Sequence, residues 1–130
     1  MTNHKATTAI AIIVLALVIM ATSIGRAAAA PPRRGTVAYC KAHSAGMIER
    51  KCIIRVIFGR AHGRGAVRVA WCESRLDPRA SNGQYKGVFQ MGSSERARYG
   101  HGPTVEAQSR AAKRYFIDSG SDWSPWSCKP

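Results

Sequence analysis

The chain has 130 residues and carries 20 lysines and arginines against 7 aspartates and glutamates, a formal net charge of +13. Its first thirty residues are mostly apolar and unlike the rest, so about 100 residues remain to fold, which is enough for one domain and excludes a multidomain protein. A domain of this size buries only about two-thirds of its unfolded surface, so covalent crosslinks are expected.

The first thirty residues are typical of an export signal. Lys5 precedes an apolar run at 9–21, and four alanines at 27–30 offer the small residues that signal peptidases accept. We expect a signal peptide that is cleaved after Ala29. An uncleaved membrane anchor is the alternative, since the apolar stretch approaches the roughly 20 residues that span a bilayer. Either outcome places residues 31–130 outside the cytoplasm, secreted or associated with the cell envelope.

Four cysteines lie in the exported part, and their even number favours disulfides. Of the three pairings we prefer Cys40–Cys52, which closes a local loop, and Cys72–Cys128, which ties the chain end to the middle. In the loop-entropy model these closures would contribute about 3 and about 4 kcal/mol. A zinc site is the alternative, with ligands drawn from Cys40, His43, Cys52 and His62. The paired short cysteine spacings of structural zinc sites are absent, however, so we expect no metal and no organic cofactor.

The positive charge persists after the export segment is removed. Residues 31–130 keep 18 lysines and arginines against 7 aspartates and glutamates, a net charge of +11. For an exported protein this charge favours wall polymers, anionic lipid head groups or acidic glycans as partners, and not nucleic acid. The cations are spread along the chain without a run of five, so we interpret the charge as an indicator of location and not as a binding site.

Two helices are predicted in the first half of the domain, which we place at 41–130 after a proline-rich and arginine-rich linker at 31–40. Ser44 is a candidate N-cap, and the apolar residues that follow it predict a helix over 44–58. The glycines that come next would end this helix. A second helix is predicted over 66–74 or 66–76, because the following Asp77-Pro78 pair disfavours helix.

The second half is predicted to be less regular. A turn signal and scattered aromatic residues at 81–91 indicate a short irregular hairpin or loop. A short helix follows at 95–99, and a longer one begins at its N-cap Thr104 and ends at Gly120. The aromatic tail at 123–128 should pack back on the core. We therefore predict a mainly α domain, small and stapled by disulfides, with one short irregular β or loop segment.

Glu73 is the candidate catalytic residue. It lies on the same predicted helix face as Ala66, Val69 and Ala70, so it extends an apolar stripe. Burial there would raise the pKa of its carboxyl group, which suits a general acid near neutral pH. A carboxylate near a helix C-terminus also faces the negative end of the helix dipole. The alternative is a structural ion pair with a neighbouring arginine or a capping interaction.

The surrounding motifs resemble a known family. The segment Trp71-Cys72-Glu73-Ser74, followed fourteen residues after the glutamate by Gly87-Val88-Phe89-Gln90-Met91, resembles the Glu-Ser and Gly-Leu-Met-Gln pattern of soluble lytic transglycosylases. Residues 66–128 are similar to the small secreted actinobacterial members of that family. The cysteine before the glutamate and the cysteine after the last tryptophan are also similar to those of resuscitation-promoting factors. This resemblance implies a lysozyme-like α+β domain.

The resemblance also implies an activity, cleavage of the β-1,4 bond between N-acetylmuramic acid and N-acetylglucosamine in peptidoglycan. Glu73 would protonate the bond oxygen and then act as a base toward the muramic C6 hydroxyl, giving a 1,6-anhydro product. Ser74 would orient the acid, and Gln90 would bind sugar where Gly87 leaves room. Tyr115 corresponds to a helix tyrosine near the acid, although the Ala-Tyr-Asn triplet of many members is absent. We expect a monomer that acts on glycan strands, with transient membrane anchoring if the export segment is retained.

Three alternatives remain. A hydrolytic muramidase would need a second carboxylate, for which the candidates are Asp77, Glu95 and Asp122. None of these lies in a motif typical of a second catalytic acid, so the route with a single acid is favoured. A non-catalytic cationic protein that binds the cell wall is the second alternative, and a cationic antimicrobial or nucleic-acid-binding protein is the third.

Overall fold

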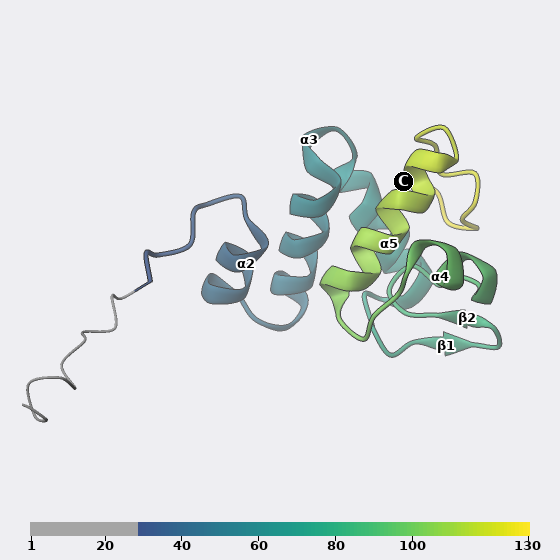
Figure 1. Cartoon of the computed structure of the whole chain (residues 1–130), viewed down its shortest axis with the longest axis horizontal. Helices are drawn as coiled ribbons and strands as arrows, with labels where there is room; N and C mark the ends of the chain where they lie inside the picture. The colour runs from purple at the N-terminus through teal and green to yellow at the C-terminus, as the bar shows by residue number, and fades with distance from the viewer. Residues whose placement is uncertain (1–28) are drawn as a thin grey trace, which may run out of the picture. The chain divides into compact units, whose positions relative to one another are not determined.

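The computed structural model describes residues 29–130, which contain four helices and two short strands. In chain order these are α2 (Val37–His43), α3 (Gly46–Ser74), β1 (Ser81–Asn82), β2 (Tyr85–Lys86), α4 (Ser93–Tyr99) and α5 (Val105–Asp118). Residues 32–130 form one compact, mainly helical unit (Figure 1). Its two disulfides join Cys40 to Cys52 and Cys72 to Cys128, the pairing preferred from the sequence.

The expected export segment lies outside the described residues, apart from positions 29 and 30. Within residues 29–130, no helix combines the length and the apolar character needed to cross a membrane. Two disulfides are typical of a protein that folds in an oxidising compartment.

The sequence pattern did not predict α2. Thr36 caps this helix, since its hydroxyl oxygen accepts a hydrogen bond of 3.1 Å from the main-chain nitrogen of Tyr39. Cys40 on α2 is fully buried. The expected linker at 31–40 therefore overlaps a helix, and regular structure begins at Val37. Ser44, expected as the N-cap of the next helix, is instead the C-cap of α2.

The long helix α3 consists of two arms that meet at Gly59. This glycine has φ 78° and ψ −176°, a conformation that interrupts the helix and that residues with a Cβ rarely adopt. Figure 1 shows that the ribbon of α3 turns back between its two arms. The prediction of a break after Phe58 is confirmed, but the prediction of a separate helix beginning at Ala66 was wrong, because the second arm continues through Gly63 and Gly65.

Close packing of the two arms explains why glycine is present inside the second one. A Cβ added to Gly63 would lie 2.8 Å from the carbonyl oxygen of Arg55 on the first arm. The absence of a side chain therefore lets the backbones approach each other. This tertiary contact offsets the low helix propensity of glycine.

The irregular segment predicted at 81–91 is a short hairpin. Its strands β1 and β2 pair antiparallel, with Asn82 opposite Tyr85, and Gly83 has φ 57° in the turn. An isolated bridge then joins Lys86 to Met91. This second pairing folds the intervening loop back on itself, so the loop that carries Gln90 is held at both ends.

The core lies between the arms of α3, the helix α5 and the C-terminal tail. Phe58, Phe89 and Phe116 are buried together, with ring centroids of Phe58 at 5.5 Å from Phe89 and 5.9 Å from Phe116. Trp126 of the tail is 5% exposed, and its indole nitrogen donates a hydrogen bond of 2.9 Å to the carbonyl oxygen of Phe89. The predictions that the tail packs on the core and that Thr104 caps α5 are both confirmed.

Candidate active site

Glu73 lies in the last turn of α3, beside the disulfide that joins Cys72 to the chain end. Its side chain is partly buried, and Oε1 accepts a hydrogen bond of 2.9 Å from the main-chain nitrogen of Cys128. The ion pairs among residues 29–130 do not include Glu73. Its second carboxyl oxygen has no hydrogen-bond partner within the described chain, so it remains available to a ligand.

Ser74 connects the end of α3 to the loop of the second motif. Its hydroxyl donates a hydrogen bond of 2.8 Å to the carbonyl oxygen of Val88 and lies 3.2 Å from the carbonyl oxygen of Ala70. The serine therefore links the helix end that carries Glu73 to the loop that carries Gln90.

Gln90 adopts an unusual backbone conformation with φ 46°. Its side-chain nitrogen donates a hydrogen bond of 2.9 Å to the carbonyl oxygen of Gly87, which holds the amide group across the loop. The side-chain oxygen has no hydrogen-bond partner among the described residues and can accept one from a ligand. A left-handed conformation of a residue other than glycine is strained, and such strain is often found at functional sites.

Gly87 was expected to leave room for a sugar, but the structure shows that it leaves room for the side chain of Gln108. It is buried, has φ 77°, and a Cβ added to it would lie 2.5 Å from Oε1 of Gln108. The space beside Gly87 is therefore filled by the side chain of Gln108, and this glycine is not part of the pocket wall described below. Its role in the loop is to allow the close approach of α5.

Gln108 on α5 is a buried polar residue whose side chain binds the loop that carries Gln90. Its side-chain oxygen accepts a hydrogen bond of 2.8 Å from the nitrogen of Val88, and its side-chain nitrogen lies 3.0 Å from the carbonyl oxygens of both Pro78 and Gly102. Three segments that are distant in sequence thus share one amide group. The sequence gave no signal of these contacts.

Glu73 and Gln90 line the same pocket of about 260 Å³. The other lining residues are Asn82, Tyr85, Pro125, Trp126 and Ser127. The structure therefore brings together the acid of the first motif, the amide of the second motif and the C-terminal tail. The sequence identified the tail as a packing element and did not indicate that it forms a wall of the pocket.

A second pocket of about 210 Å³ adjoins the first, since both are lined by Tyr85, Gln90, Pro125 and Trp126. It adds Glu95 from α4 and Tyr115 from α5. We refer to the two pockets together as the groove. Glu73 thus lies in one part of the groove and Glu95 in the other.

Tyr115 lies in the part of the groove that contains Glu95, away from the pocket that Glu73 lines. Its ring packs at 5.2 Å from the rings of both Tyr99 and Trp126. Burial, followed by the charge of Glu95, raises the pKa of the Tyr115 hydroxyl. Tyr115 is therefore a neutral hydrogen-bonding group at neutral pH.

Of the three carboxylates considered as a second acid, only Glu95 lines the groove. Asp77 is exposed and accepts a hydrogen bond of 3.0 Å from the nitrogen of Arg79, as expected of a turn residue. Asp122 is also exposed and accepts from the nitrogen of Ser124, which lowers the pKa of its carboxyl group. These two residues stabilise turns.

The alternative zinc site is not formed by the residues proposed for it. Cys40 and Cys52 are joined in a disulfide, so neither can supply a thiolate. Within residues 29–130, no group of three or more histidine, cysteine and acidic side chains is suitably placed to hold a metal ion.

Comparison with known proteins gave no assignment. No family model matches the chain, and searches of curated proteins and of solved structures found no match. The chemistry of the site must therefore be inferred from its own residues: a carboxyl group with one free oxygen, beside a primary amide, in a depression with tyrosine and tryptophan walls. Such an arrangement can hold a polar ligand by hydrogen bonds and against aromatic side chains.

Proposed function

We propose that the protein is an exported lytic transglycosylase with a lysozyme-like domain, which cleaves the β-1,4 bond between N-acetylmuramic acid and N-acetylglucosamine in peptidoglycan. The observation that carries this proposal is that Glu73 and Gln90 line one pocket, although they are seventeen positions apart in the chain. These are the two residues that the sequence motifs single out. The adjoining pocket offers room for a further sugar unit beside the one that Glu73 would contact.

The proposed reaction begins with a proton transfer from Glu73 to the glycosidic oxygen as the bond from that oxygen to C1 of the muramic sugar breaks. The carbonyl oxygen of the substrate's own N-acetyl group bonds to C1 and stabilises the positive charge. The Glu73 carboxylate then removes the proton from the C6 hydroxyl, whose oxygen displaces the acetamido oxygen from C1. The product has a 1,6-anhydro bond, and Glu73 recovers its proton, so one carboxyl group is sufficient.

The described residues support this use of Glu73. The main-chain nitrogen of Cys128 holds Oε1 and thereby orients the carboxyl plane, which leaves the other oxygen to carry the transferred proton. Gln90, fixed by its bond to the carbonyl oxygen of Gly87, can accept a hydrogen bond from a sugar hydroxyl or acetamido group. Tyr85, which is exposed, provides a flat surface in the same pocket.

A hydrolytic muramidase is the second candidate, because one observation favours it. Glu95 lines the adjoining part of the groove and shares four wall residues with the pocket of Glu73. Paired carboxylates on the two sides of a glycosidic bond are the usual machinery of glycoside hydrolases. In that reaction water replaces the C6 hydroxyl, and the product has a reducing end.

Product analysis distinguishes these candidates. The purified protein is incubated with insoluble peptidoglycan, and the released fragments are analysed by mass spectrometry before and after borohydride reduction. We expect 1,6-anhydro ends, which borohydride does not reduce. Reducible ends in all released fragments would establish the hydrolase, and binding without release would establish a non-catalytic wall-binding protein.

A further inference from the structure

A second depression lies at the turn of α3 and is separate from the groove. It has a volume of about 730 Å³ and shares no lining residue with either pocket of the groove. Its charged lining residues are all arginines, namely Arg55, Arg60 and Arg64. We refer to it as the arginine hollow, which is completed by Gly35, Val56, Gly59 and Gly63.

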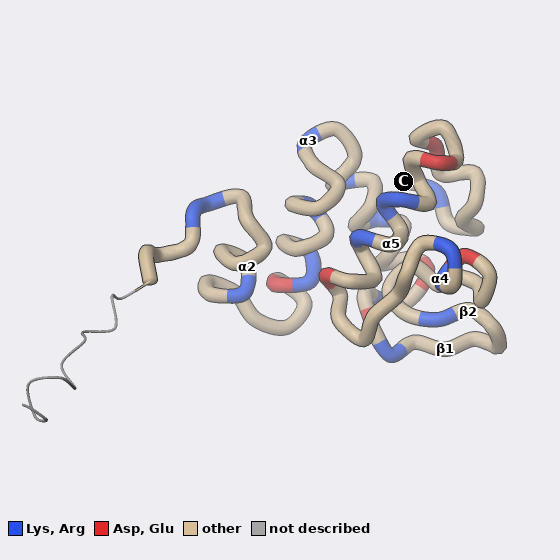
Figure 2. Tube along the Cα trace, viewed as in Figure 1, with Lys and Arg blue, Asp and Glu red and all other residues tan. Residues whose placement is uncertain are grey.

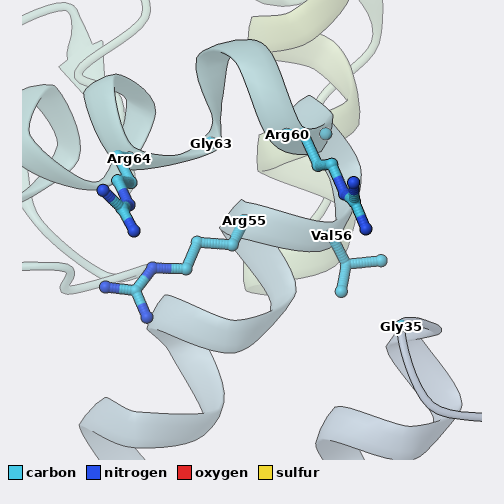
Figure 3. Close-up of a pocket in the computed structure, with 7 residues that line it drawn as sticks. Gly35, Arg55, Val56, Arg60, Gly63 and Arg64 are labelled. Atoms are coloured by element: carbon cyan, nitrogen blue, oxygen red, sulfur yellow. The ribbon is translucent and has the colours of Figure 1, made fainter.

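The turn of the helix gathers cations that are dispersed in the sequence. Arg55 belongs to the first arm of α3, whereas Arg60 and Arg64 belong to the second, which begins at the break at Gly59. Figure 3 shows the guanidinium groups of Arg55 and Arg64 extending to one side of the hollow, with Arg60 beside Val56 on the other. The sequence alone therefore did not reveal this cluster, because the arms come together only where Gly63 lies against Arg55.

The positive charge of the hollow is not neutralised within the described chain. Among residues 29–130 the ion pairs use Lys41, Arg98 and Arg110, and the three arginines of the hollow form neither an ion pair nor a side-chain hydrogen bond. Between Glu49 and Glu73 the chain has no aspartate or glutamate. Figure 2 shows the same imbalance at the turn of α3, where lysine or arginine is present and acidic residues are absent.

This arrangement disfavours the folded helix. Arg60 and Arg64 are four positions apart on the second arm and both line the same depression, where like charges repel each other. Arg55 adds a third charge to the same depression. An anion bound between them would relieve the repulsion, so the cluster is better suited to binding than to stabilising the fold.

The chemistry of the hollow favours a polymer with repeated phosphate groups. The guanidinium group presents a planar fork of donors that matches phosphate oxygens, and three such groups can bind successive anionic groups of one strand. The only side chain of the lining that is apolar is Val56, which offers little surface to a folded protein. A volume of about 730 Å³ exceeds the needs of a single phosphate ion.

We propose that the arginine hollow binds phosphodiester groups of an anionic polymer of the cell envelope. Arg64 precedes Glu73 by nine residues on the same helical arm, which corresponds to about 14 Å along the helix axis. A polymer strand held in the hollow would therefore retain the groove close to the wall and raise the local concentration of glycan. The location of this polymer in the envelope rests on the proposed function, whereas the affinity for phosphodiesters does not.

The test measures binding of the purified protein to soluble poly(glycerol phosphate) by isothermal titration calorimetry at low and at physiological salt. The hollow variant carries Arg55→Gln, Arg60→Gln and Arg64→Gln. The control carries Arg68→Gln, Arg75→Gln and Arg79→Gln, which removes the same charge from exposed residues outside the hollow that form no ion pair among the described residues. We expect at least a tenfold loss of affinity in the hollow variant, a loss of twofold or less in the control, and weaker binding by all three proteins at higher salt.

An equal loss in both variants would overturn the proposal, because the affinity would then follow net charge alone. The proposal would also be overturned if the parent bound vesicles containing phosphatidylglycerol but not the polymer, and if the hollow variant lost this vesicle binding. The partner would then be a membrane surface. Thermal unfolding verifies the fold of the hollow variant, whose Tm should equal or exceed that of the parent because repulsion is removed.

The same variants separate this proposal from the proposed function. On peptidoglycan from which anionic polymers have been stripped, the hollow variant should release fragments at the parent rate. Loss of polymer binding with intact release would leave the enzyme assignment standing. Absence of release by the parent, with polymer binding intact, would remove the enzyme assignment and leave the phosphodiester site.

Discussion

The main-chain nitrogen of Cys128, the third residue from the end of the chain, donates a hydrogen bond of 2.9 Å to Oε1 of Glu73. The disulfide between Cys72 and Cys128 holds this donor beside the acid. The chain end is therefore a positioning element for the carboxyl group. It also forms part of the groove wall, through Pro125, Trp126 and Ser127.

Removal of the Cys72–Cys128 bridge should lower kcat even under conditions where the protein remains folded. The double variant Cys72→Ala/Cys128→Ala loses a crosslink between residues 56 positions apart, which contributes about 4 kcal/mol in the loop-entropy model. It also frees the donor to Glu73. We expect at least a tenfold fall in kcat at a temperature where circular dichroism shows the variant to be folded.

The matched control for this variant is Cys40→Ala/Cys52→Ala. That bridge spans 12 positions, is worth about 3 kcal/mol in the same model, and joins α2 to α3 away from the groove. Its removal should lower Tm and leave kcat of the folded protein unchanged. Equal losses of kcat in both double variants would show that Cys128 has no special relation to the acid.

Gln108 should be a large contributor to stability. Gln108→Ala leaves the buried nitrogen of Val88 without its acceptor and removes both donors to the carbonyl oxygens of Pro78 and Gly102. Unsatisfied buried groups and the cavity together should lower the free energy of unfolding by about 2 to 4 kcal/mol, measured by urea denaturation. The exposed Gln84→Ala should change it by less than about 0.5 kcal/mol. Similar small values for both would mean that the loop is held by other contacts.

The stability of the fold should depend on pH through Glu106. Hydrogen bonds from Lys41 on α2 and from Arg110 on α5 lower the pKa of its carboxyl group below the usual 4.5. A folded-state pKa below the unfolded one adds stability above the unfolded pKa, and this contribution is lost as pH falls through the folded pKa. At pH 7, Glu106→Gln should therefore cost about 1 kcal/mol, a value typical of partly exposed ion pairs.

The pH dependence is checked by urea denaturation of both proteins at several pH values between 7 and about 2. The difference between the parent and Glu106→Gln should be constant from pH 7 to about 5 and shrink in more acidic solution. Glu49→Gln is the control, because its carboxylate has no ion pair among the described residues. A difference that stays constant down to the lowest pH would show that the ion pairs of Glu106 do not contribute.

Several elements of this fold follow from local sequence. Thr104 precedes α5 and Gly120 follows it, as predicted. The Thr104 hydroxyl accepts a hydrogen bond from the nitrogen of Ala107, and Gly120 adopts a left-handed conformation. Both features depend only on residues near each end of the helix. The hairpin was also recognisable from its Asn82-Gly83 turn. The preference for pairing Cys72 with Cys128 required only that the aromatic tail return to the core.

Other features depend on tertiary contacts that local patterns do not reveal. The helix α2 has seven residues and only one buried one, Cys40, so it shows no apolar periodicity. Gly63 and Gly65 are weak helix formers, yet they remain helical because neighbouring backbone and tail atoms lie against them. Glu95 joins the groove only through the placement of α4 against the hairpin and α5, which no spacing in the sequence specifies.

Glu95→Gln distinguishes the roles available to the second carboxylate. If the single-acid route operates, this variant keeps forming 1,6-anhydro ends, and the loss of a carboxylate charge that contacts substrate raises KM more than it lowers kcat. Glu95 is then a binding residue of the groove. A fall in kcat of a hundredfold or more, with KM unchanged and reducible ends in the parent's products, would instead make it the second acid of a hydrolase.

The central claim is that Glu73 donates a proton to the glycosidic bond of peptidoglycan. The most direct measurement is the rate at which soluble muropeptides appear from insoluble peptidoglycan with the parent protein, with Glu73→Gln and with the control Glu49→Gln. We expect a fall of about 10² to 10⁴-fold for Glu73→Gln, the range typical of a lost general acid, with an unchanged circular dichroism spectrum and a normal rate for Glu49→Gln. Release by Glu73→Gln at the parent rate would contradict the claim.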